Sequence, residues 1–145
     1  MADDSRARPG AAKEILLVED HLETAQMLTM VLEDEGYRVK SANRARSALD
    51  FLLPRRCGPD LILLDLSLPD MDAAEMVSEL RRARADVPPI IVVSAKTARS
   101  VEEAARLVGA SGVLRKPFPI DALLECIEDA LEQRPVNFQI RHAYR

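Results

Sequence analysis

Short apolar runs alternate with helical patterns along most of the chain, and this alternation constrains the fold more than any other feature of the sequence. The runs have strand length, and the segments between them repeat apolar residues at helical spacing. The expected strands span residues 14–19, 37–42, 61–65, 90–95 and 112–116. The expected helices span residues 22–35, 45–53, 73–83, 99–108 and 119–133. Such alternation predicts an α/β fold, a doubly wound parallel sheet with helices on both faces.

The length of 145 residues suits one domain with a substantial core. We expect the folded domain over residues 13–133, after a flexible polar arm at 1–12 and before a C-terminal tail or linker at 134–145, which falls outside the alternation. The first residues lack the apolar stretch of a secretory signal. No apolar run is long enough to cross a bilayer. We therefore expect a cytoplasmic protein that does not contact a membrane.

The net charge and the cysteine content limit the functions that this chain is expected to have. A net charge of −4 argues against direct binding of nucleic acid through bulk electrostatics. Cys57 and Cys126 are not at metal-ligand spacing, so we interpret them as reduced, apolar filler. Three arginines near the end of the helix expected at 73–83, namely Arg81, Arg82 and Arg84, are interpreted as a solvated face that complements the helix dipole.

In the stretch LILLDLSLPDMD, four consecutive apolar residues directly precede Asp65. A carboxylate at the exit of a buried strand is costly unless it meets water, a cation or a hydrogen-bond donor. Two interpretations are open at this point. Asp65 is either a helix N-cap or solvated loop carboxylate, or a reactive group at the open edge of the sheet.

Polar residues follow four of the five expected strands. Their positions are Glu19 and Asp20, Asp65, Ser94, and Lys116. Because the carboxyl ends of parallel strands lie on one edge of the sheet, these groups should converge there. Clustered carboxylates repel one another unless a cation joins them, and Mg²⁺ prefers such oxygen ligands together with phosphate. Asp65 would then be a nucleophile that forms an aspartyl phosphate, with the metal ion and Lys116 stabilising the transferring group.

The motifs that carry these residues are ILLVEDH, LILLDLSLPDMD, IIVVSA and GASGVLRKPF. Together they resemble the receiver domain of two-component response regulators, in a form similar to the single-domain chemotaxis receivers. The resemblance covers about residues 13–133. It implies a flavodoxin-like (βα)5 fold with strand order 2-1-3-4-5, and a protein that is not a classical turnover enzyme.

The resemblance also implies roles for individual residues. A sensor histidine kinase or histidine phosphotransfer protein would donate the phosphoryl group to Asp65. Mg²⁺, for which Mn²⁺ can substitute, would be held by Asp20, Asp65 and the backbone carbonyl of Ser67, with Glu19 nearby or bridged by water. Ser94, the N–H of Ala95 and Lys116 would contact the phosphoryl group, so that the catalytic set is Asp65, Ser94 and Lys116. A cis peptide bond is expected between Lys116 and Pro117.

One position departs from the family pattern. The residue three before the lysine is usually aromatic and acts with the hydroxyl residue Ser94 as the conformational switch, but here it is Val113. Valine is short and β-branched and has few rotamers. We therefore expect the readout to be a shift of the loop after Ser94. That shift would change a partner-binding face made by residues 99–108, 112–115 and 120–132.

Three alternatives remain open. The chain could be the receiver piece of a longer transcription factor or hybrid kinase. It could be a phosphatase of the haloacid dehalogenase type, although there the nucleophile comes early and the acidic pair last. It could also be a pseudo-receiver that is not phosphorylated, although no acid and no lysine of the pattern is lost. His21, next to the acidic pair, is interpreted as a solvated residue that opens a helix, because Mg²⁺ disfavours imidazole.

Overall fold

The structure is a computed structural model that describes residues 12–55, 58–132 and 140–141. It contains one parallel sheet with the strand order β2-β1-β3-β4-β5-β6. The strands are β1 (Glu14–Val18), β2 (Arg38–Ala42), β3 (Leu61–Asp65), β4 (Ile90–Ser94), β5 (Gly112–Arg115) and β6 (Ile140–Arg141). The helices are α1 (Leu22–Asp34), α2 (Ala45–Leu52), α3 (Ala73–Ala83), α4 (Ala98–Val108) and α5 (Ile120–Leu131). The predicted order of the first five strands is confirmed.

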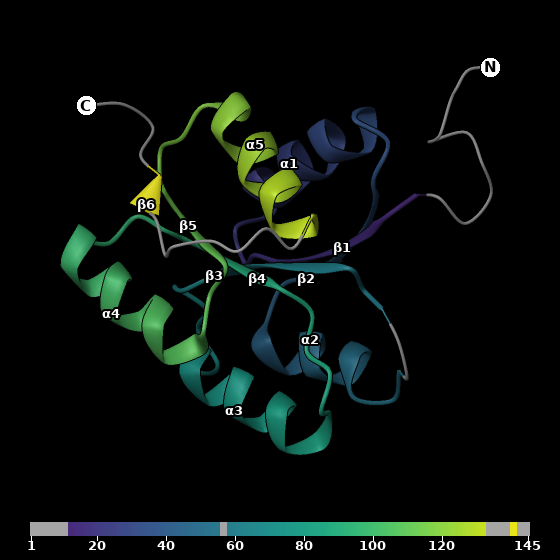
Figure 1. Cartoon of the computed structure of the whole chain (residues 1–145), viewed down its shortest axis with the longest axis vertical. Coiled ribbons are helices and arrows are strands. Elements are labelled where there is room, and N and C mark those ends of the chain that lie inside the picture. Colours follow the sequence, from purple (N-terminus) through teal and green to yellow (C-terminus); the bar gives the residue numbers. More distant parts are fainter. Residues whose placement is uncertain (1–11, 56–57, 133–139, 142–145) are drawn as a thin grey trace.

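Helices cover both faces of the sheet, as expected for a doubly wound fold. Figure 1 shows α1 and α5 on one face and α2, α3 and α4 on the other. Successive strand residues alternate between the two cores. Leu63 packs in the cluster with α1 and α5, whereas Leu64 packs in the cluster with α2, α3 and α4. All five residues of β3 are buried, which explains why its sequence is a continuous apolar run until Asp65.

The predicted helix and strand limits agree with the structure to within two residues. The segments β3 and α3 match the predictions fully. Helix α5 is shorter than predicted, because Pro119 is its N-cap and Glu132 its C-cap. Gly109 ends α4 in the left-handed conformation, where glycine carries no steric penalty. The peptide bond Lys116–Pro117 is cis, which confirms that prediction, and Gly58–Pro59 is cis as well.

The sheet has a sixth strand that the sequence pattern did not predict. Residues Ile140–Arg141 pair in parallel with Val113 and Leu114 of β5. The segment predicted as a C-terminal tail or linker at 134–145 thus contributes a two-residue strand to the sheet. Without β6, this side of β5 would present unpaired N–H and C=O groups, and these groups can accept a short added strand. Residues 1–11 of the predicted arm, Cys57 and the other tail residues lie outside the described part of the chain.

Of the three arginines near the end of α3, Arg81 and Arg82 are exposed, as the interpretation of a solvated face expects, whereas Arg84 is half-buried. Arg81 and Arg84 also make hydrogen bonds that were not predicted. Arg81 Nη2 donates a hydrogen bond of 2.7 Å to the carbonyl of Val108 at the end of α4. Arg84 Nη1 donates one of 3.3 Å to the carbonyl of Gly58. The last carbonyls of a helix have no partner within that helix, so an arginine on the neighbouring helix can satisfy one. Arg81 thereby joins α3 to α4.

In the described ranges no helix is long and apolar enough to span a membrane.

The N–H groups in the first turn of α2 are bound by a side chain from a distant part of the chain. Its N-cap residue, Arg44, makes no side-chain capping bond. Asp70, in the loop between β3 and α3, accepts hydrogen bonds from the N–H groups of Ala45 (3.0 Å) and Arg46 (2.9 Å) instead. Partial desolvation opposes ionisation of Asp70, but these bonds outweigh it and lower its pKa below the ordinary value.

We expect Asp70→Ala to lower the free energy of unfolding by about 1 kcal/mol, the typical value of a helix cap. Because folding lowers the pKa of Asp70, its contribution is present above the unfolded pKa near 3.8 and is lost as the pH falls through the folded value. Urea titrations at pH 7 and at progressively lower pH should therefore show the difference from wild type shrinking in acid. Asp86→Ala, which removes an exposed aspartate, is the control and should have little effect.

Candidate functional site at the carboxyl edge of the sheet

Asp65 ends β3 and is only 3% exposed. Its Oδ1 accepts a hydrogen bond of 2.9 Å from the N–H of Ser67. The helix that follows begins at Ala73 with Asp72 as its N-cap. Asp65 is therefore neither the cap of that helix nor a solvated loop carboxylate, and the first of the two interpretations of this residue is excluded.

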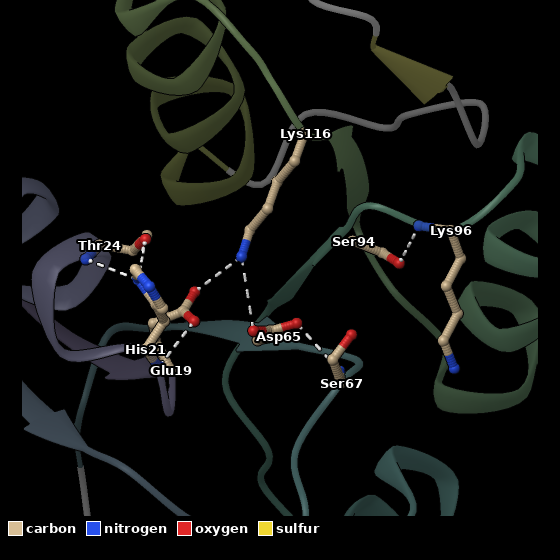
Figure 2. Close-up of polar contacts among 8 residues, drawn as sticks. All are labelled: Glu19, His21, Thr24, Asp65, Ser67, Ser94, Lys96 and Lys116. Carbon is tan, nitrogen blue, oxygen red and sulfur yellow. Dashed lines mark hydrogen bonds and ion pairs between the residues drawn. The ribbon is translucent and has the colours of Figure 1, made fainter.

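Glu19 is a second buried carboxylate at the same edge, immediately after β1, and it is 2% exposed. Its Oε2 accepts a hydrogen bond of 3.1 Å from the N–H of His21. Lys116, which follows β5, points between the two acids (Figure 2). Its Nζ lies 3.1 Å from Oε1 of Glu19 and 3.5 Å from Oδ2 of Asp65. One ammonium group thus faces two buried carboxylates.

The pKa of Glu19 is set first by burial and then by the charges beside it. Burial raises the pKa of Glu19 above its ordinary value, and the adjacent carboxylate of Asp65 raises it further. The hydrogen bonds from Lys116 and from the N–H of His21 oppose this increase but do not cancel it. Two carboxylates, those of Glu19 and Asp65, face the single ammonium group of Lys116, so a further cation would be favoured there.

Asp20 adds a third carboxylate, and it is exposed. One oxygen of each of Glu19, Asp20 and Asp65 lies within 4.8 Å of the other two. In an octahedral Mg²⁺ site with bonds of about 2.1 Å, opposite ligands are about 4.2 Å apart and neighbouring ligands about 3.0 Å apart. The three carboxylates would therefore have to move closer, or a water molecule would have to bridge one of them, for all three to serve one ion. An all-oxygen, anionic donor set of this kind fits a hard divalent cation and does not fit a soft one.

Ser94 ends β4 and its side chain is fully buried. Its hydroxyl oxygen accepts a hydrogen bond of 3.0 Å from the N–H of Lys96. Figure 2 shows this hydroxyl directed toward Lys96 and away from Asp65. Ala95, the next residue, is exposed. The predicted contacts of Ser94 and Ala95 with a phosphoryl group remain predictions.

The other residues singled out in the sequence are placed as follows. His21 is exposed and is the N-cap of α1, with Nδ1 accepting a bond from the N–H of Thr24, so the interpretation as a helix-opening residue is confirmed. Val113 is fully buried. Arg115 was not predicted as a residue of the site, and its Nε donates a hydrogen bond of 3.1 Å to the carbonyl of Lys96. Its place next to Lys116 was the available signal.

The parallel α/β fold, together with the clustered acids and their lysine at one edge of the sheet, indicates the class of protein to which the chain belongs. Residues 15–128 match the family model of the response regulator receiver domain, and the chain belongs to this family. It is thus a receiver domain of the two-component signalling systems. Family membership favours this class over the haloacid dehalogenase alternative.

Individual relatives agree with this assignment. The KDP operon transcriptional regulatory protein KdpE of Escherichia coli is 39% identical over 119 residues, which are 82% of this chain and 51% of that protein. The transcriptional regulatory protein PdtaR of Mycobacterium tuberculosis is 33% identical, over 83% of this chain and 58% of that protein. The chain thus spans little more than half the length of these curated relatives. The chemotaxis protein CheY4 of Vibrio cholerae superposes with a TM-score of 0.73 at 30% identity, covering 82% of this chain and 98% of that one.

We expect Asp65→Asn to increase the free energy of unfolding in the absence of divalent cations. The substitution removes one of two buried carboxylates that share one lysine. The relief of its desolvation cost and of its repulsion with Glu19 should exceed the loss of its 3.5 Å ion pair with Lys116, for a net gain of about 1 kcal/mol. Urea unfolding in a buffer with a chelator would measure it. Asp86→Asn makes the same charge change at an exposed position and should leave stability unchanged. A destabilised Asp65→Asn variant would contradict the proposed balance of charge.

Proposed function

We propose that Asp65 accepts a phosphoryl group from the phosphohistidine of a sensor histidine kinase or of a histidine phosphotransfer protein. A carboxylate oxygen of Asp65 attacks phosphorus, the P–N bond breaks, and its electron pair stays on the histidine nitrogen. The observation that carries this proposal is the convergence of Asp65 with Glu19, Asp20 and Lys116 at one edge of the sheet.

The residues of the site have separate roles in this proposal. Lys116 holds its ammonium beside Asp65, where it can neutralise charge on a phosphoryl oxygen. Ser94 and the N–H of Ala95 are the proposed donors to the other oxygens. Glu19 accepts from Lys116 and from the N–H of His21, and thereby fixes the lysine and the start of α1.

Mg²⁺ is the proposed cofactor, and Mn²⁺ can replace it. Asp20, Asp65 and the carbonyl of Ser67 would hold the ion, with Glu19 beside it or bridged by water. When bound, the ion would neutralise the acidic cluster and stabilise charge on the transferring group. The measured closeness of the three carboxylates supports this assignment.

We propose that the domain acts in the cytoplasm as a signalling module that promotes its own phosphorylation and dephosphorylation, with no direct binding to nucleic acid or membrane. The proposed partner face is formed by α4, β5 and α5, and β6 lies along β5 at this face. The domain is proposed to comprise residues 13–133, within a single-domain regulator or a longer transcription factor or hybrid kinase. A search for steady hydrolysis of a phosphate monoester separates this proposal from a phosphatase, because a receiver would not turn it over.

Asp65 is expected to be the sole phosphorylated residue. Acetyl phosphate with Mg²⁺ should add one phosphate to the wild-type chain, measured by intact mass, and hydroxylamine should remove it because an acyl phosphate is labile. Asp65→Asn should take up none. Asp86→Asn, at an exposed position outside the site, is the control and should label like wild type. Equal labelling of Asp65→Asn and wild type would overturn the assignment.

Mg²⁺ is expected to stabilise the fold. At a hundredfold excess over its Kd, a ligand that binds only the folded state adds about 2.7 kcal/mol to the free energy of unfolding. Asp20→Asn should lose most of this gain, since it removes one proposed ligand, and Asp86→Asn should retain it. Thermal melts over a range of Mg²⁺ concentrations would measure the effect. An unchanged shift in Asp20→Asn would argue against the metal site.

A further inference from the structure

Ser94 and Arg115 are neighbours across two strands of the sheet. They are register partners in the parallel pair of β4 and β5, and the N–H of Lys116 donates a hydrogen bond of 2.8 Å to the carbonyl of Ser94. The backbone of Ser94 is thus tied to β5. Its side chain is free of that tie and takes its direction from the loop that follows.

The loop after Ser94 is held at Lys96 by two hydrogen bonds from opposite sides. The N–H of Lys96 donates to the hydroxyl oxygen of Ser94 at 3.0 Å, and the carbonyl of Lys96 accepts from Nε of Arg115 at 3.1 Å. Arg115 thus holds the Lys96–Thr97 peptide, which directly follows the Ala95–Lys96 peptide whose N–H binds the serine hydroxyl. Figure 2 shows this hydroxyl directed toward Lys96 and away from Asp65.

Arg115 lies on the same side of the sheet as Val113. Val113 packs in the cluster that includes residues of α2, α3 and α4, whereas Leu114 packs in the opposite cluster. Strand alternation then places Arg115 on the side of Val113, one step nearer to the carboxyl edge. Val113 is fully buried and its apolar side chain can make no hydrogen bond to the loop. The link between β5 and the loop runs through Arg115.

We propose that Arg115 is a positioning residue that holds the loop 95–97 in its resting conformation and thereby keeps the Ser94 hydroxyl away from Asp65. This inference rests on the proposed phosphorylation of Asp65. When a phosphoryl group is present, Ser94 turns to donate to it, the N–H of Lys96 loses its acceptor, and the Lys96 carbonyl leaves Arg115. The bond from Arg115 thus stabilises the unphosphorylated state.

The direction in which loss of Arg115 changes the affinity for a phosphoryl mimic distinguishes a positioning role from a purely electrostatic one. A cation near the site attracts an anionic phosphoryl group, so loss of a mere cation would weaken binding of a phosphoryl mimic. Loss of a bond made only in the resting state would strengthen it. A hydrogen bond of ordinary net strength changes an equilibrium constant by about fivefold.

The test measures the apparent affinity for beryllofluoride in the presence of Mg²⁺, and the initial rate of labelling by acetyl phosphate. We expect Arg115→Ala to bind beryllofluoride about fivefold more tightly than wild type and to label faster. Arg115→Lys keeps the charge without the Nε donor and should show the same direction of change. Arg99→Ala is the matched control, because it removes an exposed arginine near the start of α4, and it should match wild type or bind more weakly.

A second measurement follows the loop without any ligand. Amide exchange at Lys96 should accelerate by about fivefold in Arg115→Ala and stay unchanged in Arg99→Ala, while amides of β3 and β4 keep their protection. Weaker or equal beryllofluoride binding by Arg115→Ala, with unchanged exchange at Lys96, would overturn this inference while leaving phosphorylation of Asp65 intact. A wild-type chain that takes up neither phosphate nor beryllofluoride would overturn both proposals.

Discussion

The arrangement of the site depends on one lysine, Lys116, which forms ion pairs with two buried carboxylates. Glu19 and Asp65 are almost fully buried, and each would be costly without a partner. Lys116 reaches both, although it follows β5, and β4 lies between β5 and β3 in the sheet. Neighbouring strands are about 4.8 Å apart, so the lysine side chain must extend across the end of β4 to reach its partners. Only small residues, Ser94 and Ala95, stand at that end.

The loop between β3 and α3, which follows Asp65, is held by hydrogen bonds at two places. At its start, the N–H of Ser67 bonds to Asp65 and orients that carboxylate. Further along, Asp70 bonds to two N–H groups at the start of α2. A loop held at both places presents its backbone to the acidic cluster with little freedom, which lowers the entropic cost of binding a cation there. The capping of α2 from a distance therefore also serves the site.

The sequence predicts those parts of the molecule that rest on long, regular patterns. Strand β3 and helix α3 were located fully, because an apolar run and a helical repeat each have sharp limits there. Strand β6 was missed, since two residues carry no periodicity. The reach of Arg81 to the carbonyl of Val108 was missed for another reason: an arginine in the last turn of a helix is equally well explained by the helix dipole. Convergence of the acids followed from topology, but the direction of the Ser94 hydroxyl depends on the fold of the next loop.

The energetics limit what a hydrogen bond from Arg115 can do. A ligand that shifts the ratio of two states from about 1:99 to about 99:1 must bind one state more strongly by about 5.5 kcal/mol. One exposed hydrogen bond contributes only about 1 kcal/mol. Arg115 can therefore set the resting balance of the loop, but contacts with the phosphoryl group itself must supply most of the switching energy. An aromatic switch adds the free energy of burying a large ring to that sum, and Val113, already fully buried, has no such contribution to add. In the proposed switch, Val113 therefore adds nothing to the free-energy difference that contacts with the phosphoryl group supply. A partner that binds one of the two proposed states would then have a larger influence on the output.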